Sequence, residues 1–145
     1  MTHLYIASDH AAYHLKEKVK TYLAAHYSHY QLQDLGCHSE ASVHYPDFGN
    51  AVAQKVAITH DAKGIILCGS GIGISIAANR VKGARAALCM TVEMATLARE
   101  HNNANILALG ARLIDEQLAY KMIDAFMITE FSGGRHQLRV EMLDK

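Results

Sequence analysis

Short apolar runs that alternate with stretches of helical spacing restrict the fold of this chain more than any other feature. Five runs have the length of strands, and they occupy residues 4–8, 31–36, 64–68, 84–89 and 105–110. Helical spacing of apolar residues is found over 11–26, 48–60, 72–80, 92–101 and 115–128, and it resumes after Gly134. This alternation predicts an α/β fold in which a parallel sheet carries helices on both faces.

Length and composition favour one folding unit, residues 1–145, with no second domain or linker. Half of the residues are hydrophobic, so the core needs no metal or disulfide to form. Lysine and arginine equal aspartate and glutamate at 14 each, which argues against a nucleic-acid-binding surface. No apolar run approaches membrane-spanning length, and the first residues lack a signal-peptide pattern.

Cysteine and histidine usage predicts neither disulfides nor a metal site. The three cysteines, Cys37, Cys68 and Cys89, are widely spaced and form no CxxC pair, so we expect a reduced, cytoplasmic setting. The ten histidines are scattered and show no metal-ligand spacing.

The most informative segment is CGSGIGISIAANR, residues 68–80, which follows the third predicted strand. Ligands of parallel sheets bind beyond the carboxyl ends of the strands. Gly69, Gly71 and Gly73 let the backbone direct several N–H groups at a phosphate or an oxyanion, next to a helix N-terminus. The pattern departs from the dinucleotide fingerprint, because its third glycine comes one residue early. A tight turn without a ligand is the alternative.

Two side chains of this segment are candidates for chemistry. Cys68 precedes a helix N-terminus, where a thiolate is favoured and can act as a base or nucleophile. Its alternative is a buried small hydrophobe, which is the role expected for Cys37 and Cys89. Ser70 either donates a hydrogen bond to a developing oxyanion or caps the helix.

Other candidates lie at several points of the chain. Asp9 and His10 follow the first strand at the same edge, although Asp9 can also cap the next helix. His101 and Asn102 precede the fifth strand, so they belong at the opposite edge unless a dimer brings them to a neighbour's site. The remaining candidates are a wall or turn at Tyr45, and three arginines that suit phosphate: Arg112, Arg135 and Arg139.

Six motifs together resemble ribose-5-phosphate isomerase type B, a family that includes allose-6-phosphate and galactose-6-phosphate isomerases. In chain order they are SDHAAYHLK, DLG, YPDFG, CGSGIGISIAANR, REHNNANILALGAR and GGRHQLRVE. The likeness extends from about His3 to Val140 and keeps the order and spacing of the motifs. It implies a five-stranded, Rossmann-like α/β/α sandwich and a homodimer, or a tetramer, with active sites at the interface and no metal or cofactor.

The resemblance also assigns roles to residues. Cys68 looks like the base that moves a proton between C1 and C2, and His101 like the residue that assists ring opening. Ser70 and the amides from Gly69 to Gly73, including Ile72, look like the hole that stabilises the enediolate. The positions that resemble contacts to the sugar and its phosphate are Asp9, His10, Tyr45, Asn102, Arg112, Arg135 and Arg139. Some of them are supplied by the partner, on or near which residues from about 131 to 145 are expected to pack.

One departure places the chain within the family. Part of the family has a glutamate base directly after the last glycine of the turn and has no cysteine at the end of the strand. This chain has Ile74 at the glutamate position, and it has Cys68. The chain therefore resembles the thiol branch. The implied activity is the interconversion of ribose 5-phosphate and ribulose 5-phosphate, a step of the pentose phosphate pathway. The alternatives are an allose-6-phosphate isomerase, a non-catalytic sugar-phosphate-binding protein and an NAD-dependent oxidoreductase.

Overall fold

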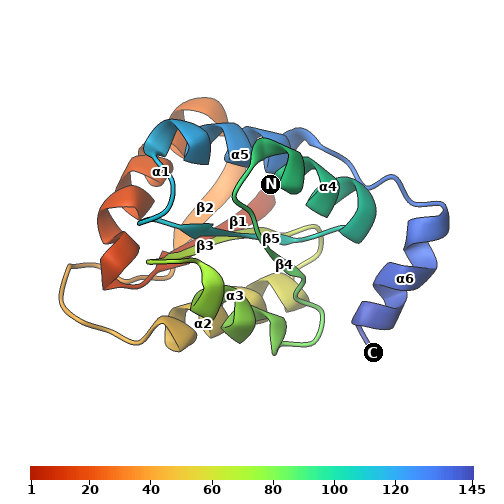
Figure 1. Ribbon diagram of the computed structural model, residues 1–145, viewed down its shortest axis with the longest axis horizontal. Coiled ribbons are helices and arrows are strands. Elements are labelled where there is room, and N and C mark those ends of the chain that lie inside the picture. The colour runs from red at the N-terminus through yellow and green to blue at the C-terminus, as the bar shows by residue number, and fades with distance from the viewer.

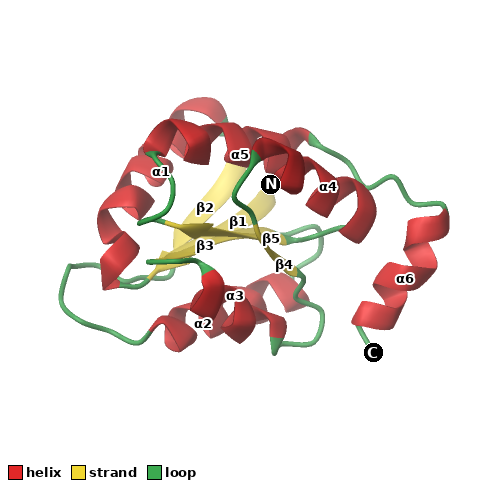
Figure 2. Ribbon diagram, in the orientation of Figure 1, coloured by secondary structure: helices red, strands yellow, loops and turns green.

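A five-stranded parallel sheet forms the centre of the molecule, as Figures 1 and 2 show for the computed structural model, which describes residues 1–145. The strands are β1 (Thr2–Ser8), β2 (Tyr30–Asp34), β3 (Lys63–Cys68), β4 (Ala86–Leu88) and β5 (Ile106–Gly110). Their order across the sheet is β2-β1-β3-β5-β4, and every neighbouring pair is parallel. The predicted α/β fold and all five strands are therefore confirmed.

Helices cover both faces of the sheet. They are the 3-10 turn η1 (His10–Ala12), α1 (Tyr13–His26), α2 (Tyr45–Ile58), α3 (Ile72–Asn79), α4 (Val92–Asn102), α5 (Glu116–Ile128) and α6 (Arg135–Leu143). Figure 1 shows α1, α4 and α5 on one face and α2 and α3 on the other, while α6 stands apart from the main body beside α4. None of the helices combines the length and the apolar character that a membrane crossing requires.

The core is divided by the sheet into two clusters, because successive strand residues point to opposite faces. Along β1, Leu4 and Ile6 join the cluster under α1, α4 and α5, and Tyr5 and Ala7 join the cluster under α2 and α3. The two central strands β3 and β5 are almost entirely buried. The ends of these strands are therefore rigid points from which a side chain can be held in place.

Two details of the helices differ from the prediction. The second helix begins at Tyr45 and contains Pro46, although we expected it to begin only at residue 48. Proline suits the first positions of a helix, because the N–H it lacks has no partner there. On α1, Val19 and Leu23 are buried, as the apolar spacing over 11–26 leads us to expect, but the buried face also includes Lys16, which is fully buried.

A change of direction in the chain creates a crevice between β1 and β3. The chain passes from β1 to α1 on one face, whereas it passes from β3 to α3 on the other face. The segments that follow these neighbouring strands therefore diverge above the sheet, which is where open α/β sheets bind ligands. Asp9 follows β1 and Cys68 ends β3, so both lie at this point.

Candidate active site

A cavity of about 580 Å³ opens at the carboxyl ends of β1, β3 and β5. Its lining comprises Asp9, His10, Ala11, Tyr45, Cys68, Gly69, Ser70, Ile72, Gly73, Ile76 and Arg112. Nine of these residues were predicted from the sequence to belong to a site. Ala11 and Ile76 were not, although Ile76 follows Ile72 by one helical turn on α3 and could have been found from that spacing.

The Cys68 thiol occupies a fixed position beside the cavity. Its side chain is only 4% exposed and packs against the core, yet it also lines the cavity. The backbone N–H of Gly71 donates a hydrogen bond to Cys68 Sγ over 3.2 Å. An N–H directed at sulfur suits the thiolate, which is the form that can accept a proton from a substrate.

Gly71 makes this geometry possible. Its φ is +77°, in the left-handed region that favours glycine. A Cβ at this position would lie 2.6 Å from Leu88 Cδ1 and 2.9 Å from the carbonyl carbon of Leu109. The turn is therefore pressed against β5, and its N–H points back to the end of β3.

The remaining amides of the turn form a smaller set of donors than the resemblance implies. The N-cap position of α3 is Gly71, and Ser70 precedes it. Ser70 Oγ accepts the N–H of Ile72 over 3.1 Å, while its own hydroxyl hydrogen can still be donated. The first intrahelical bond runs from Ser75 N–H to Gly71 O. Gly73 comes before Ser75 in the helix, so the N–H of Gly73 has no acceptor within the helix. Because Gly73 also lines the cavity, this N–H is available to a ligand.

Tyr45 and Arg112 form two walls of the cavity. The Tyr45 ring lies over Gly73, where an added Cβ would come within 2.5 Å of Tyr45 Cε1 and Cζ. The Arg112 guanidinium lies over Gly69, where an added Cβ would come within 3.0 Å of Arg112 Nη1. Arg112 forms no ion pair with a carboxylate, so its charge is available to an anionic ligand.

Asp9 and His10 also line the cavity. Asp9 is 7% exposed, and its Oδ1 accepts the N–H of Ala12, so the predicted cap is present. His10 Nδ1 accepts the backbone N–H of Val43 over 3.1 Å. Both side chains therefore face the cavity and are held by backbone groups of neighbouring turns.

Five predicted site residues do not line this cavity. Gly71 contributes only its N–H to Cys68, and the other four are His101, Asn102, Arg135 and Arg139. His101 and Asn102 end α4, before β5, so they are at the opposite edge of the sheet as expected for one subunit. The His101 ring stacks on His136 of α6, with centroids 4.3 Å apart. Partial desolvation, together with the charges of His101, Arg135 and Arg139, lowers the pKa of His136.

This second group is cationic and exposed. Arg135 and Arg139 share a face of α6, and neither forms an ion pair.

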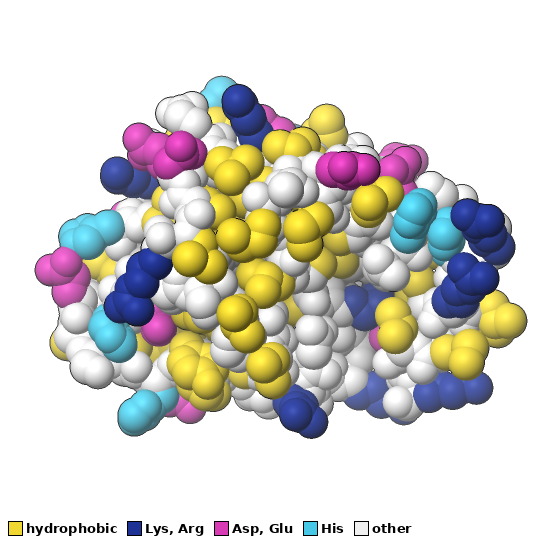
Figure 3. Space-filling model, viewed as in Figure 1, with side chains coloured by type: hydrophobic (Ala, Val, Ile, Leu, Met, Phe, Trp, Pro, Cys, Tyr) yellow, Lys and Arg dark blue, Asp and Glu magenta, His cyan; other side chains and the backbone are white.

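A broad band of hydrophobic side chains runs across the side of the molecule that is turned to the viewer in Figure 3, where α4 lies above the edge of the sheet and α3 below it. Its exposed members include Ile72, Ile76, Val92, Met94 and Leu97.

Another hollow, at the amino-terminal edge of the sheet, is lined by Lys63, Arg85 and Arg99 among others. Two of these cations have partners in the protein. Arg99 donates to the carbonyls of Thr129 and Ala104 and to Asn103, and Arg85 pairs with Asp144. No group of three histidine, cysteine or acidic side chains is arranged to hold a metal ion.

Comparison with known proteins gives a consistent result. Residues 4–143 match the family model described as ribose/galactose isomerase. The chain is 43% identical to ribose-5-phosphate isomerase B of Mycolicibacterium paratuberculosis over 97% of this chain and 88% of the relative.

Two solved structures extend the likeness to three dimensions. A ribose 5-phosphate isomerase from Thermotoga maritima is 50% identical with a TM-score of 0.91, covering 99% of this chain and 97% of that one. Ribose-5-phosphate isomerase B from Mycoplasma genitalium, with bound ribulose-5-phosphate, is 38% identical with a TM-score of 0.91, covering 98% and 93%.

Proposed function

The chain belongs to the ribose/galactose isomerase family, and from this membership and the geometry of the cavity we propose that it interconverts ribose 5-phosphate and ribulose 5-phosphate. The reaction moves a proton between C2 and C1 and one between the two oxygens, through an enediolate. The observation that carries this proposal is the position of the Cys68 thiol. It is fixed by the N–H of Gly71, and it borders a cavity that is also lined by the unpaired guanidinium of Arg112.

The cavity residues divide into two tasks. The Cys68 thiolate removes the proton from C2 of the open-chain aldose and returns it to C1. The hydroxyl of Ser70 and the N–H of Gly73 stabilise the negative oxygen of the enediolate. Arg112 attracts the phosphate, while Asp9, His10 and Tyr45 hold the sugar in the orientation that the transfer needs.

A second subunit supplies the missing cations. His101 assists ring opening, and Asn102, Arg135 and Arg139 extend the binding site from the partner's α4 and α6. Three features support this assignment: these side chains lie outside their own subunit's cavity, the arginines form no ion pair, and an apolar band flanks the cavity. In this arrangement residues 131–145 of each chain pack on or near the other subunit of a homodimer.

The wider setting of the enzyme follows from the same proposal. Its substrate and product place it in the pentose phosphate pathway, and the chemistry uses side chains and amides without a metal or cofactor. All three thiols are free, which suits a reducing cytoplasm.

Turnover of ribose 5-phosphate, measured as ketose formation, tests the proposal. Cys68→Ala is expected to lower kcat by about a hundredfold or more, because a positioned acid–base group contributes at least that factor. Cys89→Ala is the matched control, since Cys89 is a buried thiol that does not line the cavity. Near-normal turnover by Cys68→Ala would exclude the thiol as the base.

Two further measurements address the alternatives. Turnover of allose 6-phosphate at a higher kcat/KM than ribose 5-phosphate would reassign the substrate, because the sugars differ by one carbon and cavity depth decides between them. Saturable binding of ribose 5-phosphate without ketose formation would identify a sugar-phosphate sensor.

A further inference from the structure

Lys16 is a buried cation that the proposed mechanism does not use. Its side chain is fully buried, and its Nζ donates to both carboxylate oxygens of Asp34 at 2.7 Å and to the carbonyl of Cys37 at 2.6 Å. Burying an ion pair has a large desolvation cost, so an apolar residue in its place is often no less stable. The pair therefore calls for an explanation other than stability.

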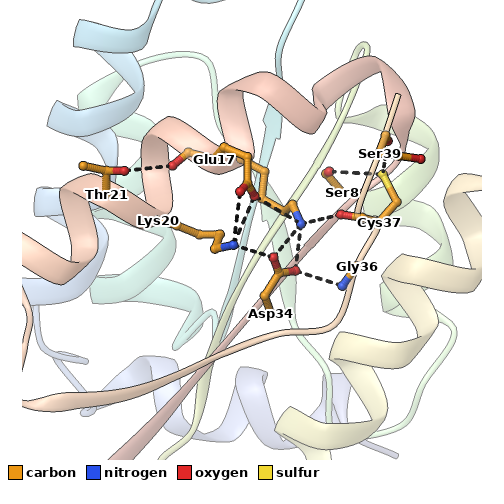
Figure 4. Close-up of polar contacts among 9 residues, drawn as sticks. Ser8, Glu17, Lys20, Thr21, Asp34, Gly36, Cys37 and Ser39 are labelled. Atoms are coloured by element: carbon orange, nitrogen blue, oxygen red, sulfur yellow. Dashed lines mark hydrogen bonds and ion pairs between the residues drawn. The ribbon is translucent and has the colours of Figure 1, made fainter. Parts of the chain in front are cut away.

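Asp34 joins this cation to the end of β2. It also pairs with Lys20 at 2.8 Å and accepts the N–H of Gly36 at 2.9 Å, and Figure 4 shows its carboxylate between these groups. Burial alone raises the pKa of Asp34, but the hydrogen bonds from Lys16 and Lys20 outweigh it and leave that pKa lowered. The carboxylate is thus held in its charged form, as the anchor of the Lys16 ammonium.

The segment that Lys16 restrains is the β2–α2 loop, residues 35–44. Its first part continues alongside β1, where Ser8 exchanges hydrogen bonds with Gly36 and Cys37. Residues 38–42 are then exposed, and the contact of Glu40 with His14 is between exposed side chains. This exposed part lies between two bonded ends, which are Cys37, where Lys16 holds the carbonyl, and Val43.

The far end of the loop reaches the cavity. The backbone N–H of Val43 donates to His10 Nδ1, and Tyr45 follows two residues later as the first residue of α2. A nitrogen that accepts this bond carries no hydrogen, so the neutral His10 ring has its hydrogen on Nε2. Because His10 lines the cavity, Nε2 is then a donor suited to a phosphate or hydroxyl oxygen.

We infer that Lys16 is a positioning residue for His10, acting through the β2–α2 loop. The ammonium fixes the Cys37 carbonyl, the loop carries this restraint to the Val43 N–H, and that N–H selects the His10 tautomer that donates to substrate. The inference rests on the proposed function, and it assigns to the buried pair a role in substrate binding. Lys20 shares the Asp34 carboxylate but makes no bond to the loop carbonyl.

Kinetics of Lys16→Met and Lys20→Met on ribose 5-phosphate test the inference. Lys16→Met should raise KM by about threefold to tenfold, the factor associated with one hydrogen bond, with a smaller change in kcat. Lys20→Met, which removes the same charge from the same helix, should leave KM unchanged. In a His10→Ala background, Lys16→Met should have no further effect on KM, because its intermediary is absent. A rise in KM that persists without His10, or that Lys20→Met reproduces, would refute the inference.

A measurement without turnover separates this inference from the proposed function. Nitrogen-15 NMR of the His10 ring should show a single Nε2–H tautomer in the wild type and a mixture in Lys16→Met, with circular dichroism as the control for folding. An unchanged tautomer in a folded Lys16→Met protein would overturn the inference even if the chain were not an isomerase. Should Lys16→Met fail to fold, Asp34→Asn keeps an acceptor for Gly36 while weakening the anchor. It should shift KM and the tautomer in the same direction, and wild-type values for both would refute the idea.

Discussion

Replacing Gly73 with alanine should impair substrate binding while leaving the fold intact. The added Cβ would lie 2.5 Å from two ring atoms of Tyr45, so the ring must move. Tyr45 is 41% exposed and stands at the first turn of α2, so its ring can rotate toward solvent at low cost. The substitution thus displaces one wall of the cavity without compressing the core.

The change in the stability of Gly73→Ala is the sum of two opposing contributions. Alanine in a helix is favoured over glycine by about 0.5–1 kcal/mol, which offsets the lost contacts of Tyr45. For 145 residues, about 2.1 cal/mol/K per residue converts 1 kcal/mol into about 3 °C of Tm, so the expected shift is within about 3 °C. Loss of one hydrogen bond from Tyr45 to the substrate should raise KM by about tenfold.

Gly71→Ala provides the contrast. Its Cβ would meet Leu88 Cδ1 at 2.6 Å and backbone atoms of Leu109 and Gly110 at 2.9 and 3.0 Å, and the backbone is left-handed there. Strain and overpacking together should cost about 3 kcal/mol, or roughly 10 °C of Tm.

The assays are thermal unfolding at a fixed protein concentration and initial rates with ribose 5-phosphate. Tyr45→Phe should reproduce the KM of Gly73→Ala if the hydroxyl is what binds. Wild-type KM for Gly73→Ala, or a loss of Tm as large as that of Gly71→Ala, would refute this account of the wall.

Two other predictions concern the dimer and alkaline pH. If His101 serves the partner's site, exchanging subunits between inactive Cys68→Ala and His101→Ala proteins should restore about a quarter of wild-type activity. Half of the dimers are then mixed, and each mixed dimer holds one intact site out of two. No recovery of activity would place both residues in the site of one subunit. Burial, aided by hydrogen bonds to Asp124, raises the pKa of Tyr22 to about 12 and also raises that of Tyr27. Because both pKa values are raised in the folded state, the contribution of the two phenols to stability is complete below their ordinary pKa of 10.0. The contribution of Tyr22 is lost as pH rises through about 12. Denaturant unfolding at about pH 9 and about pH 11 should therefore show a smaller loss of stability for Asp124→Asn than for the wild type.

Most of the cavity could be predicted from the sequence because strand ends are visible in it. The run that ends at Cys68 has no polar alternation, which identified a central strand and hence the edge where ligands bind. Asp9 and His10 come directly after another such run. In a parallel sheet the ends of both strands lie at the same edge, so these residues could be placed beside Cys68 from the sequence alone. The start of α2 at Tyr45 was missed, since a proline in a polar segment is equally compatible with a loop.

Lys16 illustrates what local pattern does not reveal. A lysine between Leu15 and Val19 is usually assigned to the solvent face of a helix. Positions 16, 19 and 23 nevertheless share the buried face, and Lys16 is tolerated there because the Asp34 carboxylate and the Cys37 carbonyl accept its hydrogen bonds. That pairing depends on the register of β2 beside β1, which is a property of the assembled sheet.

The structure separates the group that moves the proton from the groups that hold the sugar. Cys68 belongs to a strand buried between β1 and β5, and its sulfur is fixed by a turn that admits no side chain at Gly71. His10 and Tyr45, in contrast, depend on a loop whose middle is exposed. Proton transfer needs a constant distance to carbon, which a central strand provides, whereas a loop can adjust to a sugar that must enter and leave. Substitutions around Cys68 should accordingly change kcat, and substitutions that loosen the β2–α2 loop should change KM.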